Sequence, residues 1–160
     1  MSEGETTRNT KEYRFQVAVV DWLYGRTRKD NKTFGCNPPM PGLLFTHHYA
    51  GRKGSSEGFF LQQLGVRPGM ADILCWWNTG GTLHAGMLEL KVDADMSAAQ
   101  HKIKGTCIQL GIKYEMARNP EQVIGAYRHW GLNPLHTAIL TPDYSTKQEK
   151  FKQAYDFYKP

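Results

Sequence analysis

The sequence predicts an α/β domain in which a mixed central β-sheet is flanked by helices. Segments with helical periodicity alternate with short strand-like runs through most of the 160 residues. A turn-forming stretch, Asn78 to Thr82, separates two strand-length runs and is typical of a β-hairpin, because its two glycines tolerate positive φ. The segments together predict the order α-β-α-β-β-α-β-α. A chain of this length is expected to form one domain with a substantial core.

The first part of the chain is expected to supply a helix, a strand and a second, short helix. The first helix spans Lys11 to about Tyr24, the strand Leu43 to Tyr49, and the short helix Glu57 to Leu64. The residues at helical spacing on the apolar side of the first helix are Tyr13, Val17, Val20 and Leu23. The basic, Gly/Pro-rich stretch from Gly25 to Gly42 is expected to be irregular, because its prolines fix φ and lack an N–H group.

The second part contains the hairpin and the elements that follow it. The hairpin strands are Ala71 to Trp77 and Leu83 to Val92, and a capped helix follows over 97–111. A strand from Ile112 to Ala117 and a helix from Pro120 to Trp130 then complete the expected core.

The two ends of the chain are assigned separately from the domain, which is placed at 11–132. Residues 1–10 are polar and are expected to be disordered. Residues 133–160 form a C-terminal extension, with a strand from Leu135 to Leu140 and a helix from Thr146 to Tyr158. The apolar side of that helix is expected to pack on the domain or on a dimer partner.

Composition excludes several classes of protein. Apolar residues make up 40% of the chain and charged residues 22%, as in a globular domain, and the net charge of +5 suits a phosphate-rich partner. Three widely spaced cysteines without a CxxC pattern indicate neither a disulfide framework nor a zinc site. There is no long apolar run, signal peptide or phosphate-cradling motif, so we expect a cytoplasmic protein with no membrane association and no organic cofactor.

Three charged residues stand in the hairpin where a sheet is normally apolar. Asp72 lies near the start of the first strand, while Glu89 and Lys91 lie in the second and, by strand alternation, point the same way. If the strands pair, Asp72 can lie beside Glu89, and two close carboxylates repel unless a cation joins them. Mg²⁺ or Mn²⁺ would resolve this conflict, with the Leu90 carbonyl as a further ligand. The alternative is a solvated face with a surface salt bridge.

The surroundings of these residues resemble a known family. GVRPGMADIL, then GMLELK and then SAAQ are similar, in this order, to the motifs of the VRR-NUC family, the virus-type replication-repair branch of the PD-(D/E)xK nucleases. The resemblance spans about Glu12 to Trp130, and it departs from the family pattern at Ala71, where the family has proline. It implies a restriction-endonuclease-like PD-(D/E)xK core.

The resemblance also implies further site residues. A Glu from the first helix approaches the metal site in this family, and Glu12 in EYRFQ matches that position, with Gln16 one turn on. Gln100 would support the catalytic Lys91, although S-x-x-Q is also a capping box in which the amide simply binds the backbone. The basic turn after the first strand, with Arg52 and Lys53, is expected to contact DNA phosphates.

Other polar residues are weaker candidates. Arg67, just ahead of the acid strand, is one more expected phosphate contact. His47 and His48 are neighbours on a strand and face opposite ways, so both cannot bind one ion. Asp93 and Asp95 lie in a loop and are expected to be solvated.

The leading hypothesis is a metal-dependent DNA endonuclease that hydrolyses phosphodiester bonds. Asp72 and Glu89 would hold Mg²⁺ or Mn²⁺, Lys91 would orient or help deprotonate water, and Gln100 would support that geometry. Stand-alone nucleases of this kind are often phage-encoded, and several act as homodimers on branched or flapped DNA, which implies the cytoplasm of a bacterial or phage-infected cell. The alternative from another class is a catalytically silent nuclease fold kept as a DNA-binding module.

Overall fold

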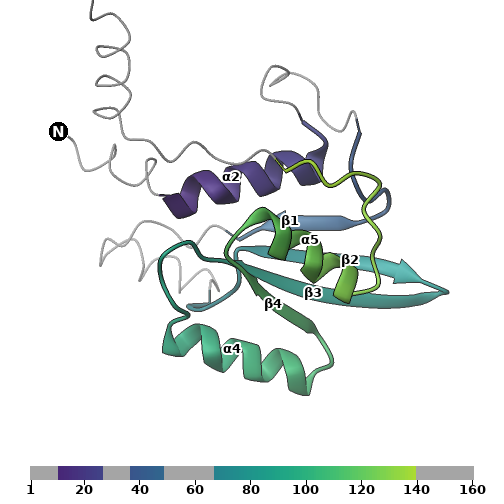
Figure 1. Cartoon of the computed structure of the whole chain (residues 1–160). Helices are drawn as coiled ribbons and strands as arrows, with labels where there is room; N and C mark the ends of the chain where they lie inside the picture. Colours follow the sequence, from purple (N-terminus) through teal and green to yellow (C-terminus); the bar gives the residue numbers. More distant parts are fainter. Residues whose placement is uncertain (1–10, 27–36, 49–66, 140–160) are drawn as a thin grey trace, which may run out of the picture.

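The computed structural model describes residues 11–26, 37–48 and 67–139 (Figure 1). Three helices and four strands lie in these ranges, and every one of them is predicted from the sequence. The helices are α2 (Lys11–Tyr24), α4 (Ala98–Gln109) and α5 (Pro120–His129), and the strands are β1 (Leu44–His47), β2 (Ile73–Thr79), β3 (Thr82–Leu90) and β4 (Lys113–Ala117). The α/β class with a mixed central sheet and flanking helices is therefore confirmed.

The four strands form one sheet in the order β1-β2-β3-β4. β1 and β2 are antiparallel, β2 and β3 are antiparallel, and β3 and β4 are parallel. Thr79 pairs with Thr82, so Gly80 and Gly81 form a two-residue turn, and both have positive φ, as this kind of turn requires. The chain returns from β3 to β4 through α4, the crossover that a parallel pair needs.

The sheet is covered on both faces (Figure 1). On one face, α2 and α5 pack on inward side chains of β2 and β3, which include Ile73, Cys75, Leu88 and Leu90. On the other face, α4 packs through Cys107 on a smaller cluster with Ala71, Met87 and Tyr114. Each helix layer therefore approaches the sheet from its own side, and residues that alternate along β3 belong to different layers.

The buried side of α2 differs from the prediction. Tyr13 and Val17 are 43% and 41% exposed. The buried residues of this helix are Phe15, Ala18, Val19, Trp22 and Leu23. Apolar residues occur on more than one side of α2, and the side with the two large aromatic rings removes the most apolar surface from water. Periodicity located the helix correctly. Of the four predicted core-facing residues, Leu23 is buried and Val20 packs partly buried against the core, while Tyr13 and Val17 are exposed.

The predicted strand from Leu135 to Leu140 is wrong in its described part, because residues 135–139 form no strand. Leu135 N–H donates to the Pro39 carbonyl at 2.8 Å, and Trp22 Nε1 donates to the His136 carbonyl at 3.3 Å. These contacts tie the segment to α2 and to the stretch before β1 rather than to a sheet edge.

Several predictions lie outside the described residues. These are the disordered N-terminus, the helix from Glu57 to Leu64, the helix from Thr146 to Tyr158 and most of the Gly/Pro-rich stretch. The division at 11–132 and 133–160 therefore stays a prediction. In the ranges that the structure describes, no helix is long and apolar enough to span a membrane.

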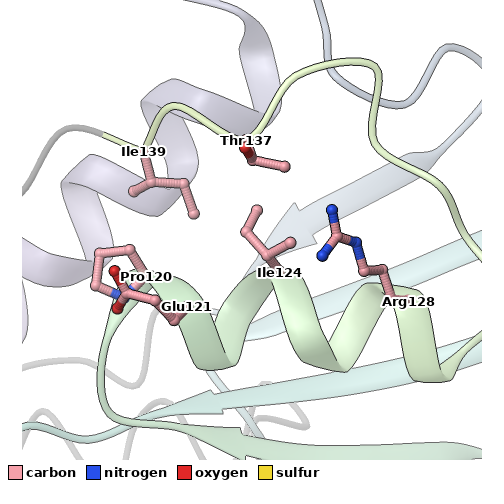
Figure 2. A pocket seen from close by; sticks show the side chains of 6 residues that line it. All are labelled: Pro120, Glu121, Ile124, Arg128, Thr137 and Ile139. Carbon is pink, nitrogen blue, oxygen red and sulfur yellow. The ribbon is translucent and has the colours of Figure 1, made fainter.

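An open pocket of about 300 Å³ lies between α5 and the segment that follows it (Figure 2). Its lining residues are Pro120, Glu121, Ile124, Arg128, Thr137 and Ile139. None of the residues predicted to perform chemistry lines this pocket, so the candidate site must lie elsewhere.

The contact between β3 and Trp130 gives a stability prediction. A Cβ at Gly86 would lie 2.7 to 3.0 Å from three ring atoms of Trp130, and that ring is stacked on Trp77 with centroids 5.6 Å apart. Gly86→Ala should therefore lower the free energy of unfolding by about 1–3 kcal/mol in urea denaturation. Gly105→Ala, in α4 with nothing near the added carbon, should raise it by roughly 0.5–1 kcal/mol. Equal effects of the two substitutions would contradict this packing.

Candidate active site

The register of the hairpin places Asp72 across from Glu89. Ile73 pairs with Leu88, so the residue before Ile73 and the residue after Leu88 face each other at the open end of the strands. Leu90 N–H donates to Asp72 Oδ2 at 2.8 Å, which ties the acid to the β3 backbone. The predicted neighbourhood of the two carboxylates is therefore present.

Lys91 joins this pair to the first helix. Its Nζ lies 2.9 Å from Glu89 Oε1 and 3.0 Å from Glu12 Oε1, and its side chain is only 12% exposed. Glu12, in the first turn of α2, therefore reaches the site, where its contact is with the lysine. Its expected role as a metal ligand stays a prediction.

Gln100 forms the capping box and also contacts the candidate site, at Glu89 rather than at Lys91. Its Oε1 accepts from Ser97 N–H at 2.8 Å while Ser97 Oγ accepts from Gln100 N–H, so the capping box at the start of α4 is formed. Its Nε2 donates to Glu89 Oε1. The two uses are compatible because the carbonyl and the NH₂ of one amide point to different partners. Helix capping fixes the position from which Gln100 holds Glu89.

Gln16 also contacts the candidate site, although no role was predicted for it from the sequence beyond its place beside Glu12. It lies one turn after Glu12 on α2, and its Nε2 donates to Asp72 Oδ1 at 3.1 Å. Asp72 therefore receives one hydrogen bond from a helix and one from β3. Helical spacing from Glu12 was the signal in the sequence, since residues four apart lie on one side of a helix.

The carboxylates are difficult to ionise in this environment. Burial raises the pKa of Asp72 to about 6, against the lowering effect of the Leu90 amide and Lys91. Burial, and then the charge of Asp72, raises the pKa of Glu89 to about 7. Burial works to lower the pKa of Lys91, but its hydrogen bonds to Glu89 and Glu12 outweigh this, so that pKa is raised. The site therefore holds an ammonium group beside two acids that take up protons at a higher pH than ordinary carboxyl groups, Glu89 near pH 7 and Asp72 near pH 6.

The donor set fits a hard divalent cation. Glu89 is fully buried, and its Oε2 has no hydrogen-bond partner among the described residues. Mg²⁺ is commonly bound through one or two carboxylates, with water and phosphate oxygens completing its coordination. Within the described ranges, no three His, Cys, Asp or Glu side chains converge closely enough to ligate an ion by themselves. Asp72, Glu89 and the Leu90 carbonyl would therefore hold the ion together with water or substrate.

The turn before β2 is packed tightly against the start of α4. Gly69 has φ +84°, and a Cβ there would lie 2.5 Å from the Ala99 carbonyl carbon and 2.8 Å from Gln100 N. Only glycine fits this approach, which brings the chain into Asp72 beside the helix that carries Gln100. Arg67 is exposed in the same turn, while Arg52 and Lys53 lie outside the described residues.

The loop between β3 and α4 is held by ion pairs. Asp93 pairs with Lys11 at 3.0 Å, and Asp95 pairs with Arg118 at 2.6 Å. Both acids are largely exposed, with side chains 71% and 94% accessible, as expected for a loop. His48 contacts the site through its backbone, since its N–H donates to the Asp72 carbonyl.

Replacing Glu89 tests the electrostatics of the metal-free protein. The folded-state pKa of Glu89, about 7, lies above the ordinary 4.5. The contribution of protonated Glu89 to the free energy of unfolding is therefore at its maximum below about pH 4.5 and is lost as the pH rises through 7. Glu89→Gln mimics the protonated form, so it should be more stable than the wild type at pH 8 in EDTA, by up to about 3 kcal/mol. The difference should vanish near pH 4.5.

Thermal denaturation across this pH range measures the effect. Glu121→Gln, at an exposed position of α5, is the matched control and should leave the pH profile unchanged. A lower melting temperature for Glu89→Gln at pH 8 would contradict the proposed cost of the buried charge.

Comparison with known proteins gives the fold a precedent. A solved structure described as a VRR_NUC domain protein is similar, with a TM-score of 0.51 and 14% sequence identity. The match covers 82% of this chain and 97% of that chain. No family model matches the sequence, and no curated protein matches it. At this identity the likeness establishes the fold, and it agrees with the resemblance found in the motifs. The chain therefore has the fold of a VRR_NUC domain, as its sequence predicted.

Proposed function

We propose that this protein is a Mg²⁺- or Mn²⁺-dependent DNA endonuclease. The observation that carries the proposal is the convergence of Asp72, Glu89, Lys91 and Gln100 at one end of the hairpin. A carboxylate pair with one fully buried member and an adjacent ammonium is costly to maintain, and a role in structure alone does not require it. The fold shared with a VRR_NUC domain protein supports the same activity.

Each residue has a chemical task in phosphodiester hydrolysis. Asp72 and Glu89, with the Leu90 carbonyl, would hold the metal, which when bound neutralises charge on the phosphate and lowers the pKa of bound water. Lys91 would orient the attacking water and offset the negative charge that develops at phosphorus. Gln100 and Gln16 would keep the two carboxylates in position by hydrogen bonds to Glu89 and Asp72.

Binding of the substrate would use basic residues around the site. Arg67, Arg52 and Lys53 are proposed phosphate contacts, and the net charge of +5 favours association with DNA. We further propose a homodimer that acts on branched DNA in the cytoplasm of a bacterial or phage-infected cell. Branch selectivity depends on the spacing of two active sites across a dimer, so a four-way junction and a molar-mass measurement by light scattering test this part.

Loss of the lysine or of the acid should abolish cleavage while leaving the fold intact. Supercoiled plasmid and a labelled four-way junction would be incubated with Mg²⁺, Mn²⁺ or EDTA. Lys91→Ala and Asp72→Ala should each lower the cleavage rate by at least about 100-fold. The first removes the ammonium that offsets charge at phosphorus, and the second removes a carboxylate that would hold the metal. Lys113→Ala, exposed at the opposite end of the parallel strand pair, should cleave like the wild type.

The possible results separate the two classes of function. Cleavage by both site variants, or cleavage in EDTA, would refute the assignment. Salt-sensitive DNA binding with no cleavage in either metal would indicate the DNA-binding module instead. Circular dichroism of each variant shows whether the fold is retained.

Metal binding should be strongly dependent on pH. Protons compete with the ion for Asp72 and Glu89, whose pKa values are raised to about 6 and about 7. The apparent affinity for Mn²⁺, measured by calorimetry, should therefore fall by roughly tenfold or more between pH 8 and pH 6. An affinity that is constant over this range would show that the ion does not bind these carboxylates.

A further inference from the structure

The hydroxyl of Tyr114 is a buried polar group that the proposed chemistry does not use. Tyr114 lies in β4, is 7% exposed, and its hydroxyl oxygen has no hydrogen-bond partner among the described residues. Buried hydroxyl groups are normally satisfied by protein or by an ordered water. A tyrosine left without either would be less favourable at this position than phenylalanine.

A second unsatisfied atom lies on the same face of the sheet. Tyr114 pairs with Met87 across the parallel strands, and Glu89 is two residues further along β3, so all three side chains point toward α4. Oε2 of Glu89 is buried and has no partner among the described residues, while its Oε1 binds Gln100 and Lys91. Two buried polar atoms, neither with a partner among the described residues, thus lie on the face of the sheet that α4 covers.

Among the described residues, the hydrophobic neighbours of the Tyr114 side chain offer its hydroxyl only weak sulfur acceptors. The cluster around it is apolar or sulfur-containing and comprises Ala71, Met87, Met96, Ile103, Cys107 and Ile112. Lys104 lies over the ring, with Nζ 6.0 Å from the centroid, and it is a donor. Burial raises the pKa of the Tyr114 hydroxyl, and the charge of Glu89 is the next largest cause, which agrees with their placement in one compartment.

We propose that Tyr114 is a positioning residue of the active site, whose hydroxyl donates through one bound water to Oε2 of Glu89. A water between the two groups satisfies both, and the carboxylate oxygen keeps a second lone pair for a metal ion. Gln100 on Oε1 and the water on Oε2 would then fix the plane of the carboxylate from both ends. The effect of Tyr114 on metal affinity and cleavage rests on the proposed function.

Tyr114→Phe tests this role because it removes one oxygen and keeps the ring in the cluster. Mn²⁺ affinity would be measured by calorimetry at pH 8, and kcat and KM by cleavage of a labelled DNA. Tyr114→Phe should weaken Mn²⁺ binding by about 10- to 100-fold and lower kcat, with KM for DNA unchanged. Tyr127→Phe is the matched control, since Tyr127 is fully buried on the opposite face with its hydroxyl 3.6 Å from Cys75 Sγ.

A double-mutant cycle in metal-free protein gives a readout that does not depend on catalysis. Tyr114→Phe and Glu89→Gln should shift the urea midpoint non-additively if a water joins the two side chains, whereas Tyr127→Phe and Glu89→Gln should be additive. Additive shifts for the first pair, with Mn²⁺ affinity of Tyr114→Phe within twofold of the wild type, would overturn the inference and leave the nuclease proposal standing. If Tyr114→Phe weakens Mn²⁺ binding but the wild type cleaves no DNA, the inference about Tyr114 stands and the nuclease proposal is overturned. Absence of Mn²⁺ binding by the wild type would overturn both.

Discussion

Two carboxylates held side by side, one of them fully buried, are the constraint on which the rest of this structure depends. The register of β2 and β3 puts Asp72, which is partly buried, across from Glu89, which is fully buried. The surrounding elements supply donors to this pair: α2 through Gln16, the β3 backbone through Leu90 N–H, and α4 through Gln100. The pKa values of about 6 and 7 show that these donors do not fully compensate for burial and repulsion. Carboxyl groups whose ionised forms are destabilised in this way are typical of functional sites, because they lower the stability of the fold.

The position of the site follows from the layers of the fold. It lies at the end of the hairpin strands, where the helix layers on the two faces of the sheet both reach the carboxylates. Glu12 and Gln16 come from one layer and Gln100 from the other, so neither face of the sheet could assemble the site alone. Because Gln100 also closes the capping box, the start of α4 and the orientation of Glu89 are set by the same side chain. Gly69 also links Asp72 to the start of α4, because only glycine lets the turn before Asp72 pack against that end of the helix.

The half of the sheet away from the candidate site is held by an aromatic cluster that takes no part in the proposed chemistry. Trp77 and Trp130 stack with their planes 5° apart, and Tyr127 meets Trp130 edge-on at 5.3 Å between centroids. This aromatic cluster packs α5 on β2 and β3 and makes no contact that the chemistry requires. Cores of this kind can be rebuilt from other apolar side chains of similar volume, which agrees with a shared fold at 14% identity.

The sequence by itself determined the elements of the described chain, the hairpin with its two-glycine turn, and the candidate residues Asp72, Glu89, Lys91 and Gln100. The elements follow from local rules, namely strand alternation, turn chemistry and capping, that a few neighbouring residues satisfy. Asp72, Glu89 and Lys91 stand out as charges in an apolar hairpin, and the resemblance to the VRR-NUC motifs supports them and adds Gln100. Tertiary structure alone decided which side of α2 is buried, that residues 135–139 add no strand, and that Glu12 contacts Lys91 and Gln16 contacts Asp72. It also decided that Tyr114 and Glu89 lie on the same face of the sheet, the face that α4 covers. These tertiary contacts depend on which surfaces, distant in the sequence, bury the most apolar area when they pack together. The pattern within a single segment does not contain that information.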